Sequence, residues 1–145
     1  MYKHWCFIFL IPLLSIGCGK DQNVNTHIQE GASGGTGIII NVSDGNPISK
    51  PVYSWFDTNN NSDTTASRVT VAPNSPNNAP PVWDVFDATL QNSIHSPVVH
   101  GPPPPGSAQQ VVNPELDLQT NVWYRVTVTK GNQTTTGFRE FLILP

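Results

Sequence analysis

Cysteine is almost absent from this chain of 145 residues, which contains only Cys6 and Cys18. Cys6 lies inside an apolar N-terminal segment that we expect to be removed from the mature protein. A mature chain that begins at Cys18 holds a single cysteine, so no disulfide forms within it. We therefore expect the hydrophobic core alone to stabilise the fold, and we expect a free thiol at Cys18 to be a liability in an oxidising compartment.

Charged residues are also scarce, at 12% of the chain. The 128 residues that follow Gly17 contain six Lys and Arg against ten Asp and Glu, a net charge of −4. They contain no basic cluster, which argues against a nucleic acid or an anionic membrane surface as partner. They also contain no nucleophile elbow, phosphate-binding loop or paired carboxylates, so we expect neither enzyme activity nor a cofactor.

The N-terminal apolar run, from Trp5 to Leu14, is too short for a permanent membrane span. It follows Lys3 and precedes small residues, an arrangement typical of a secretory signal. The residues from Leu14 to Cys18, LSIGC, resemble the bacterial lipobox. This resemblance implies a signal peptide from Met1 to Gly17 and a mature N-terminus at an acylated Cys18, although Ser15 stands where Leu is usual. The alternative is an ordinary signal peptide with an incidental cysteine.

The lipobox resemblance also implies a location in the cell envelope. Gly19 is not the Asp that retains lipoproteins in the inner membrane of enteric bacteria, so we expect an outer-membrane lipoprotein if the source is Gram-negative. Residues 18–35 are polar and carry no sustained apolar period, so we expect a flexible tether there. We expect one domain over residues 36–145, monomeric and bound to the membrane through its lipid anchor.

The stretch from Leu116 to Thr129 carries the clearest structural pattern in the chain. Val122, Tyr124, Val126 and Val128 alternate with polar and outward-facing positions. This two-residue period predicts a half-buried strand of an antiparallel sheet.

Leu118 precedes Tyr124 by six residues, with turn-forming residues between them. The spacing resembles the tyrosine corner of fibronectin type III and immunoglobulin-like sandwiches, in which a Tyr hydrogen-bonds to backbone upstream. The resemblance implies an all-β, two-sheet antiparallel sandwich and no particular activity.

Other short runs of β-branched and aromatic residues support this fold class, with Pro or Gly between nearly every pair. We expect strands at residues 36–42, 52–56, 67–72, 82–86 and 137–144, and an edge strand at 111–112. Trp55 is expected in the core. The pattern at residues 82–86 leaves open which of its faces points inward.

The loop from Asp57 to Asp63 places oxygen-bearing side chains at alternate positions. This spacing resembles the first half of an acidic calcium loop, but Ser62 replaces the usual Gly and Arg68 the bidentate acid. We therefore assign no metal and interpret the segment as a solvated Asn-rich loop, with a weak calcium site as the alternative.

Two further features have weaker functional interpretations. His95 and His100 lack a zinc-ligand spacing, so we interpret them as surface loop histidines. The run from Pro102 to Pro105 predicts polyproline II, which serves either as a stiff loop or as a docking element.

Trp83 and Trp123 are the candidate binding residues. Exposed aromatic side chains on a sheet face stack on sugar rings in many carbohydrate-binding modules, whereas the alternative is that both pack against neighbouring strands. We expect a non-catalytic binding, assembly or structural module whose partner is an unknown envelope protein. A carbohydrate-binding module that uses the two Trp side chains is the alternative.

Overall fold

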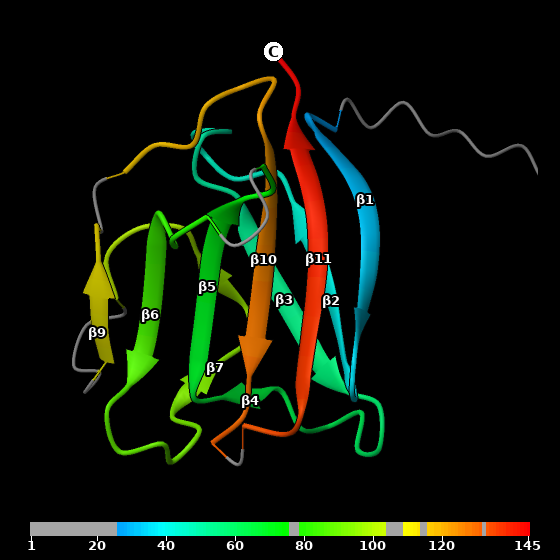
Figure 1. The fold of residues 1–145 in the computed structure, drawn as a ribbon, viewed down its shortest axis with the longest axis vertical. Coiled ribbons are helices and arrows are strands. Elements are labelled where there is room, and N and C mark those ends of the chain that lie inside the picture. The colour runs from blue at the N-terminus through cyan, green and yellow to red at the C-terminus, as the bar shows by residue number, and fades with distance from the viewer. Residues whose placement is uncertain (1–25, 76–78, 104–108, 114–115, 132) are drawn as a thin grey trace, which may run out of the picture.

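A computed structural model describes residues 26–75, 79–103, 109–113, 116–131 and 133–145, and these residues form an all-β fold. A six-stranded sheet packs against a three-stranded sheet, and a two-stranded pair lies beside them. Every strand pair is antiparallel. Figure 1 shows the six-stranded sheet in front and the smaller sheet behind it. The predicted two-sheet antiparallel sandwich is thus confirmed.

The strands have the following bounds and spatial order. The six-stranded sheet contains β1 (Ile28–Gly35), β11 (Thr136–Ile143), β10 (Trp123–Thr129), β5 (Arg68–Pro73), β6 (Trp83–Asp87) and β9 (Gln109–Val112). The three-stranded sheet contains β2 (Ile38–Ser43), β3 (Val52–Asp57) and β8 (Val98–Val99). The remaining pair contains β4 (Thr65–Ala66) and β7 (Ile94–His95). Within the described ranges no helix is long and apolar enough to cross a membrane.

The predicted two-residue periods set which side chains enter the core. On β10, Tyr124, Val126 and Val128 are buried, and the alternating positions face outward. On β2, Ile38, Ile40 and Val42 are buried in the same way. Because each sheet offers one continuous apolar face, the two faces pack together and exclude water.

The tyrosine corner is present as the sequence predicts. The hydroxyl of Tyr124 accepts a hydrogen bond from the backbone N–H of Gln119 at 3.0 Å. Leu118 is buried beside it, and its N–H donates to the carbonyl of Ser49 at 3.0 Å. The corner therefore ties the segment before β10 both to its own strand and to the loop that precedes β3.

The centre of the core is aromatic. Tyr53 of β3 lies between the sheets, with ring centroids 5.8 Å from Trp83 and 5.9 Å from Phe141. Phe141 in turn stacks on Tyr124 at 5.8 Å. Trp55, on the same face of β3 as Tyr53, is also buried, as predicted. The aromatic rings thus connect both sheets to the tyrosine corner.

The predicted start of the domain was wrong. Residues 28–35 form β1, which pairs with β11 at the edge of the large sheet, so the tether does not extend to residue 35. The segment has no apolar period because most of its side chains face solvent and its glycines pack closely. A Cβ on Gly31 would lie 2.6 Å from the Trp123 ring, and one on Gly34 would lie 2.9 Å from the Phe138 ring. The absence of side chains at these positions lets the strand lie on the two rings.

The structure also resolves the strand whose orientation the sequence left open. On β6, Trp83 and Val85 point into the core, and Phe86 lies partly exposed on the outer face. The predicted edge strand near residues 111–112 is confirmed as β9, at the edge of the six-stranded sheet.

The two ends of the sandwich differ. The described chain begins and ends at the upper end in Figure 1. At the opposite end, which we call the far end, lie the turn at 36–37 and the loops 58–64, 88–93 and 130–135. The far end is the one at which β3, β6 and β10 finish.

Replacing Tyr124 by Phe should lower the free energy of unfolding by about 1–2 kcal/mol, because the N–H of Gln119 loses its acceptor in a part-buried site. Urea unfolding of the full chain measures this. Thr127→Val, on the outer face of the same strand, is the control and should change stability by less than about 0.5 kcal/mol. Equal stability of Tyr124→Phe and wild type would contradict a stabilising corner.

Candidate functional site

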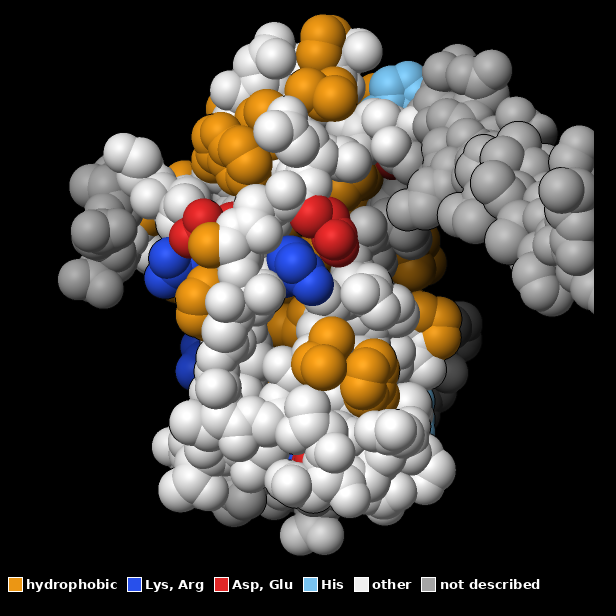
Figure 2. Space-filling model, turned by 90° about the vertical axis from the view of Figure 1, so that its right-hand side faces the viewer, with side chains coloured by type: hydrophobic (Ala, Val, Ile, Leu, Met, Phe, Trp, Pro, Cys, Tyr) orange, Lys and Arg blue, Asp and Glu red, His pale blue; other side chains and the backbone are white. Residues whose placement is uncertain are grey.

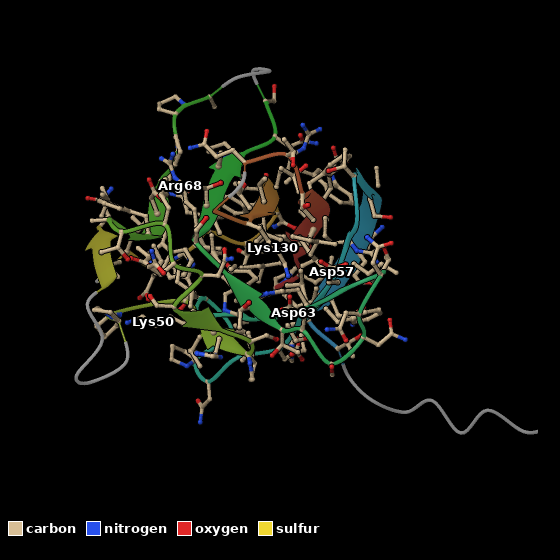
Figure 3. All side chains as sticks on the ribbon, turned by 90° about the horizontal axis from the view of Figure 1, so that it is seen from below. Lys50, Asp57, Asp63, Arg68 and Lys130 are labelled. Atoms are coloured by element: carbon tan, nitrogen blue, oxygen red, sulfur yellow. The ribbon has the colours of Figure 1, made fainter. Side chains whose placement is uncertain are left out.

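The loop from Asp57 to Asp63 is bound to a lysine of the chain. The ammonium of Lys130, at the end of β10, lies 3.1 Å from Asp57 Oδ2 and also contacts Asp63 Oδ2. Lys130 is buried, and in the view from below in Figure 3 it lies close to both aspartates. This cluster connects the far end of β3 to the far end of β10.

The contacts in this cluster favour the charged forms of Asp57, Asp63 and Lys130. The hydrogen bond from Lys130, followed by those from Thr65, lowers the pKa of Asp63 to about 2. The Asn59 N–H and then Lys130 lower the pKa of Asp57. Burial alone would lower the pKa of Lys130, but its bonds to the two aspartates outweigh burial and raise it. The cluster is therefore ionised at neutral pH.

The Lys130 ammonium binds the same carboxylates that a calcium ion would need. Asp57 Oδ1 and Asp63 Oδ1 are also engaged, by the N–H groups of Asn59 at 2.8 Å and Thr65 at 3.0 Å. In the described part of the chain, no three or more His, Cys, Asp or Glu side chains are placed to hold a metal ion. The loop therefore fits an internal ion pair better than a calcium site.

A second buried carboxylate organises the loop between β6 and β7. Asp87 accepts hydrogen bonds from the backbone N–H groups of Thr89 at 2.8 Å, Gln91 at 3.0 Å and Ser93 at 3.2 Å. It also accepts the Thr89 hydroxyl at 2.6 Å. These bonds, from Thr89 first, hold the pKa of Asp87 well below its ordinary value. An ionised Asp87 thus fixes the path of the loop 88–93.

This loop is joined to the hairpin between β10 and β11. Asn92 Oδ1 accepts the N–H of Gly131 at 2.7 Å. A Cβ on Gly131 would lie only 2.1 Å from the carbonyl oxygen of Leu90, so only glycine permits this close approach. Together with Lys130, this contact connects the described residues of loops 58–64, 88–93 and 130–135, which makes the far end a candidate binding surface.

The two candidate tryptophans differ. Trp83 is fully buried, with its indole N–H donating to the carbonyl of Gly101 at 3.0 Å, so the interpretation of Trp83 as an exposed binding residue is corrected. Its alternating pattern did not distinguish the two faces of β6. Trp123 is 37% exposed, and one edge of its ring packs on Gly31. A row of two exposed Trp side chains is therefore not formed.

The two histidines also differ in their exposure to solvent. His95 is exposed, as predicted, whereas His100 is fully buried, so its interpretation as a surface histidine was wrong. Its Nδ1 lies 2.9 Å from the Tyr53 hydroxyl, and its ring stacks on Trp83 with centroids 4.7 Å apart. Burial lowers the pKa of His100 to about 4, so the ring is neutral and part of the core.

One open edge is blocked by charge. On β2, the N–H of Val42 donates to Glu30 Oε1 at 3.0 Å, and the carbonyl of Ile40 accepts from Arg139 Nε at 3.0 Å. Arg139 Nε and Glu30 Oε1 lie 3.8 Å apart. Figure 2 shows neighbouring acidic and basic side chains on this side of the molecule. Because these backbone groups are already bonded, this part of β2 is not available for strand addition by a partner.

Several predicted features lie outside the described residues. The signal peptide from Met1 to Gly17, the acylation site Cys18 and most of the tether belong to the first 25 residues, and Pro104 and Pro105 of the proline run are likewise outside. No protein-family model, curated protein or solved structure matches the chain.

Replacing Lys130 by Met should leave two part-buried aspartates without their cation. We expect the free energy of unfolding at pH 7 to fall by about 2 kcal/mol, less than for a fully buried pair because the Asp63 side chain is 31% exposed. Lys50→Met, which breaks the surface pair with Asp117 at 3.7 Å, is the matched control and should cost under about 0.5 kcal/mol. Equal losses in urea unfolding would contradict the role of Lys130.

This cluster also predicts an acid dependence. Asp63 has a folded pKa of about 2 against an ordinary value of 3.8, so its stabilisation is complete above 3.8 and is lost as the pH falls toward 2. Urea unfolding of wild type measured between pH 5 and pH 2 should show this loss of stability. The same measurement on Lys130→Met should show a shallower loss in this window.

His100 predicts a different window. Its pKa rises from about 4 in the folded chain to 6.5 on unfolding, so the unfolded state takes up a proton first as the pH falls. Stability should therefore decrease from pH 6.5 to pH 4, by at most about 3 kcal/mol. Unfolding of His100→Asn, which keeps a polar atom near Tyr53, should lack this slope. His95→Asn should retain it; an unchanged slope in His100→Asn would refute the assignment.

Proposed function

We propose that this chain is a lipid-anchored, non-catalytic binding module of the bacterial cell envelope. The residues LSIGC at positions 14–18 support the anchor, because they combine a short apolar segment with the lipobox pattern. The connected loops of the far end support the binding role. An outer-membrane location remains our proposal, on the basis of Gly19.

The position of the first described residues supports an anchored orientation. His27 is held at the upper end of the sandwich, where its N–H donates to Asp44 Oδ1 at 2.9 Å and its carbonyl accepts the N–H of Leu144 at 2.7 Å. The proposed tether from Cys18 to Thr26 contains nine residues, and a flexible tether of that length would have a root-mean-square span of roughly 15–18 Å. An acylated Cys18 would therefore keep the upper end near the membrane and leave the far end facing away from it.

The bracing of the far end is the observation that carries the binding role. Three loops that lie far apart in sequence meet there. Lys130 and Asn92 connect them, and Asp87 orders the loop that carries Asn92. Loops gathered at one end of a sandwich form the binding surface of antibody variable domains, which is an analogy of architecture. Loops that are ordered before binding lose less conformational entropy when a partner docks. The far end therefore suits recognition better than the blocked edge of β2.

Metabolic labelling with a clickable fatty acid tests the anchor. Wild type should incorporate the label and fractionate with membranes, whereas Cys18→Ala should carry no label and leave the membrane fraction, because acylation requires that thiol. Cys6→Ala, inside the expected signal peptide, is the control and should be labelled like wild type. Unlabelled wild type would refute the lipid anchor.

A further inference from the structure

Four side chains form one row across the outer face of the large sheet at its far end. Register pairs Thr136 with Thr129, Thr129 with Arg68, and Arg68 with Phe86. Neighbouring strands are about 4.8 Å apart, so the four positions span roughly 15 Å. We call Thr136, Thr129, Arg68 and Phe86 the rim row. It lies along the lower part of the sheet face that Figure 1 presents to the viewer.

Leu90, in the loop 88–93, lies next to the rim row and lines the same hollows as its four residues. Leu90 is 47% exposed, and its backbone φ is 57°. This φ lies in the left-handed region, which residues other than glycine adopt at an energetic cost. Asp87 and the close contact of Gly131 with the Leu90 carbonyl oxygen hold it there. These contacts thus keep the apolar side chain of Leu90 partly exposed beside the rim row.

Two hollows adjoin Leu90, and both include Ser67 and Arg68. One, of about 400 Å³, is lined further by Phe86, Asp87 and Ala88. The other, of about 320 Å³, is lined further by Thr129, Gln133 and Thr136. Both volumes fall within the roughly 300–1,000 Å³ of small-ligand sites. One hollow is therefore mainly apolar, and its neighbour presents hydroxyl and amide groups.

The charges around these hollows are already balanced or engaged. Arg68 donates from Nε to Asp84 at 3.0 Å and from Nη2 at 2.6 Å, and this pair raises the pKa of Arg68. The Asp87 oxygens accept hydrogen bonds from their own loop. Lys130 is bound to Asp57 and Asp63. A strongly charged ligand would thus have to compete with an existing partner at each of these groups, whereas a neutral ligand would not.

We propose that the two hollows around Leu90 bind a neutral sugar. A sugar ring has an apolar C–H face, which suits Phe86 and Leu90, and hydroxyl edges, which suit Thr129, Gln133 and Thr136. Within the described residues the side chains of Thr129, Gln133 and Thr136 form no hydrogen bond to the protein, so their donors and acceptors are available to a ligand. The inference rests on the proposed binding role and places the site away from Trp83 and Trp123.

Leu90→Gly is the decisive variant. Glycine adopts a positive φ without strain, so the melting temperature should be no lower than that of wild type, while the apolar contact to the sugar is removed. Asn121→Gly is the matched control, because Asn121 has a φ of 60° and lies just before β10 at the opposite end of the sandwich. It relieves the same kind of backbone conformation without touching the hollows.

Calorimetric titration of the full chain in detergent uses cellohexaose, maltohexaose and mannohexaose as neutral probes and hexagalacturonate as the charged one. We expect saturable binding of at least one neutral hexamer, about tenfold weaker in Leu90→Gly and unchanged in Asn121→Gly. No saturation by any neutral probe up to about 10 mM would overturn the proposal. Equal affinity of wild type and Leu90→Gly, or preference for the charged hexamer, would also overturn it.

The labelling experiment keeps the two proposals separate. Fatty acid on Cys18 without sugar binding would remove the sugar site and leave the anchored module in place. Sugar binding without the label would remove the anchor and leave the site around Leu90 in place.

Discussion

The contact of Tyr53 with rings from the opposite sheet is the constraint on which the sandwich depends. Its ring touches Trp83 and Phe141, and Phe141 stacks on Tyr124, whose hydroxyl closes the corner before β10. The described residues contain no cysteine, so no disulfide among them would replace these contacts if they were lost. The buried His100 extends the same cluster, so protonation of this ring connects pH to the stability of the core.

The far end is stabilised by a different kind of interaction. Its three loops carry few apolar side chains, and buried charges and amides organise them instead: Lys130 with its two aspartates, Asp87 with its own loop, and Asn92 with Gly131. Each of these groups hydrogen-bonds to groups from another part of the chain or to several backbone N–H groups. The loops therefore gain order without a metal ligand set, and the charges used for this order are not presented to a partner.

The sequence predicted the features that depend on local pattern. The alternation through Tyr124, Val126 and Val128 and the six-residue spacing from Leu118 identified both β10 and its corner. It did not predict β1, because a strand that packs glycines on Trp123 and Phe138 has no apolar period to detect. It also did not identify Lys130, since a lysine that pairs with carboxylates 67 and 73 residues away in the chain leaves no local signal. The position of Leu90 was not predicted either, because it depends on the contact of its carbonyl oxygen with Gly131 in the hairpin between β10 and β11.

The pair formed by Glu30 and Arg139 has a consequence beyond the single domain. An unprotected strand at a sheet edge is a template on which another copy of the same chain can add its own strand, and that reaction accelerates as copies become crowded. Here the backbone of β2 between Ile40 and Val42 is already bonded to charged side chains from β1 and β11. Many copies could then share a small area without fusing through this edge, so crowding would multiply binding sites without nucleating aggregates.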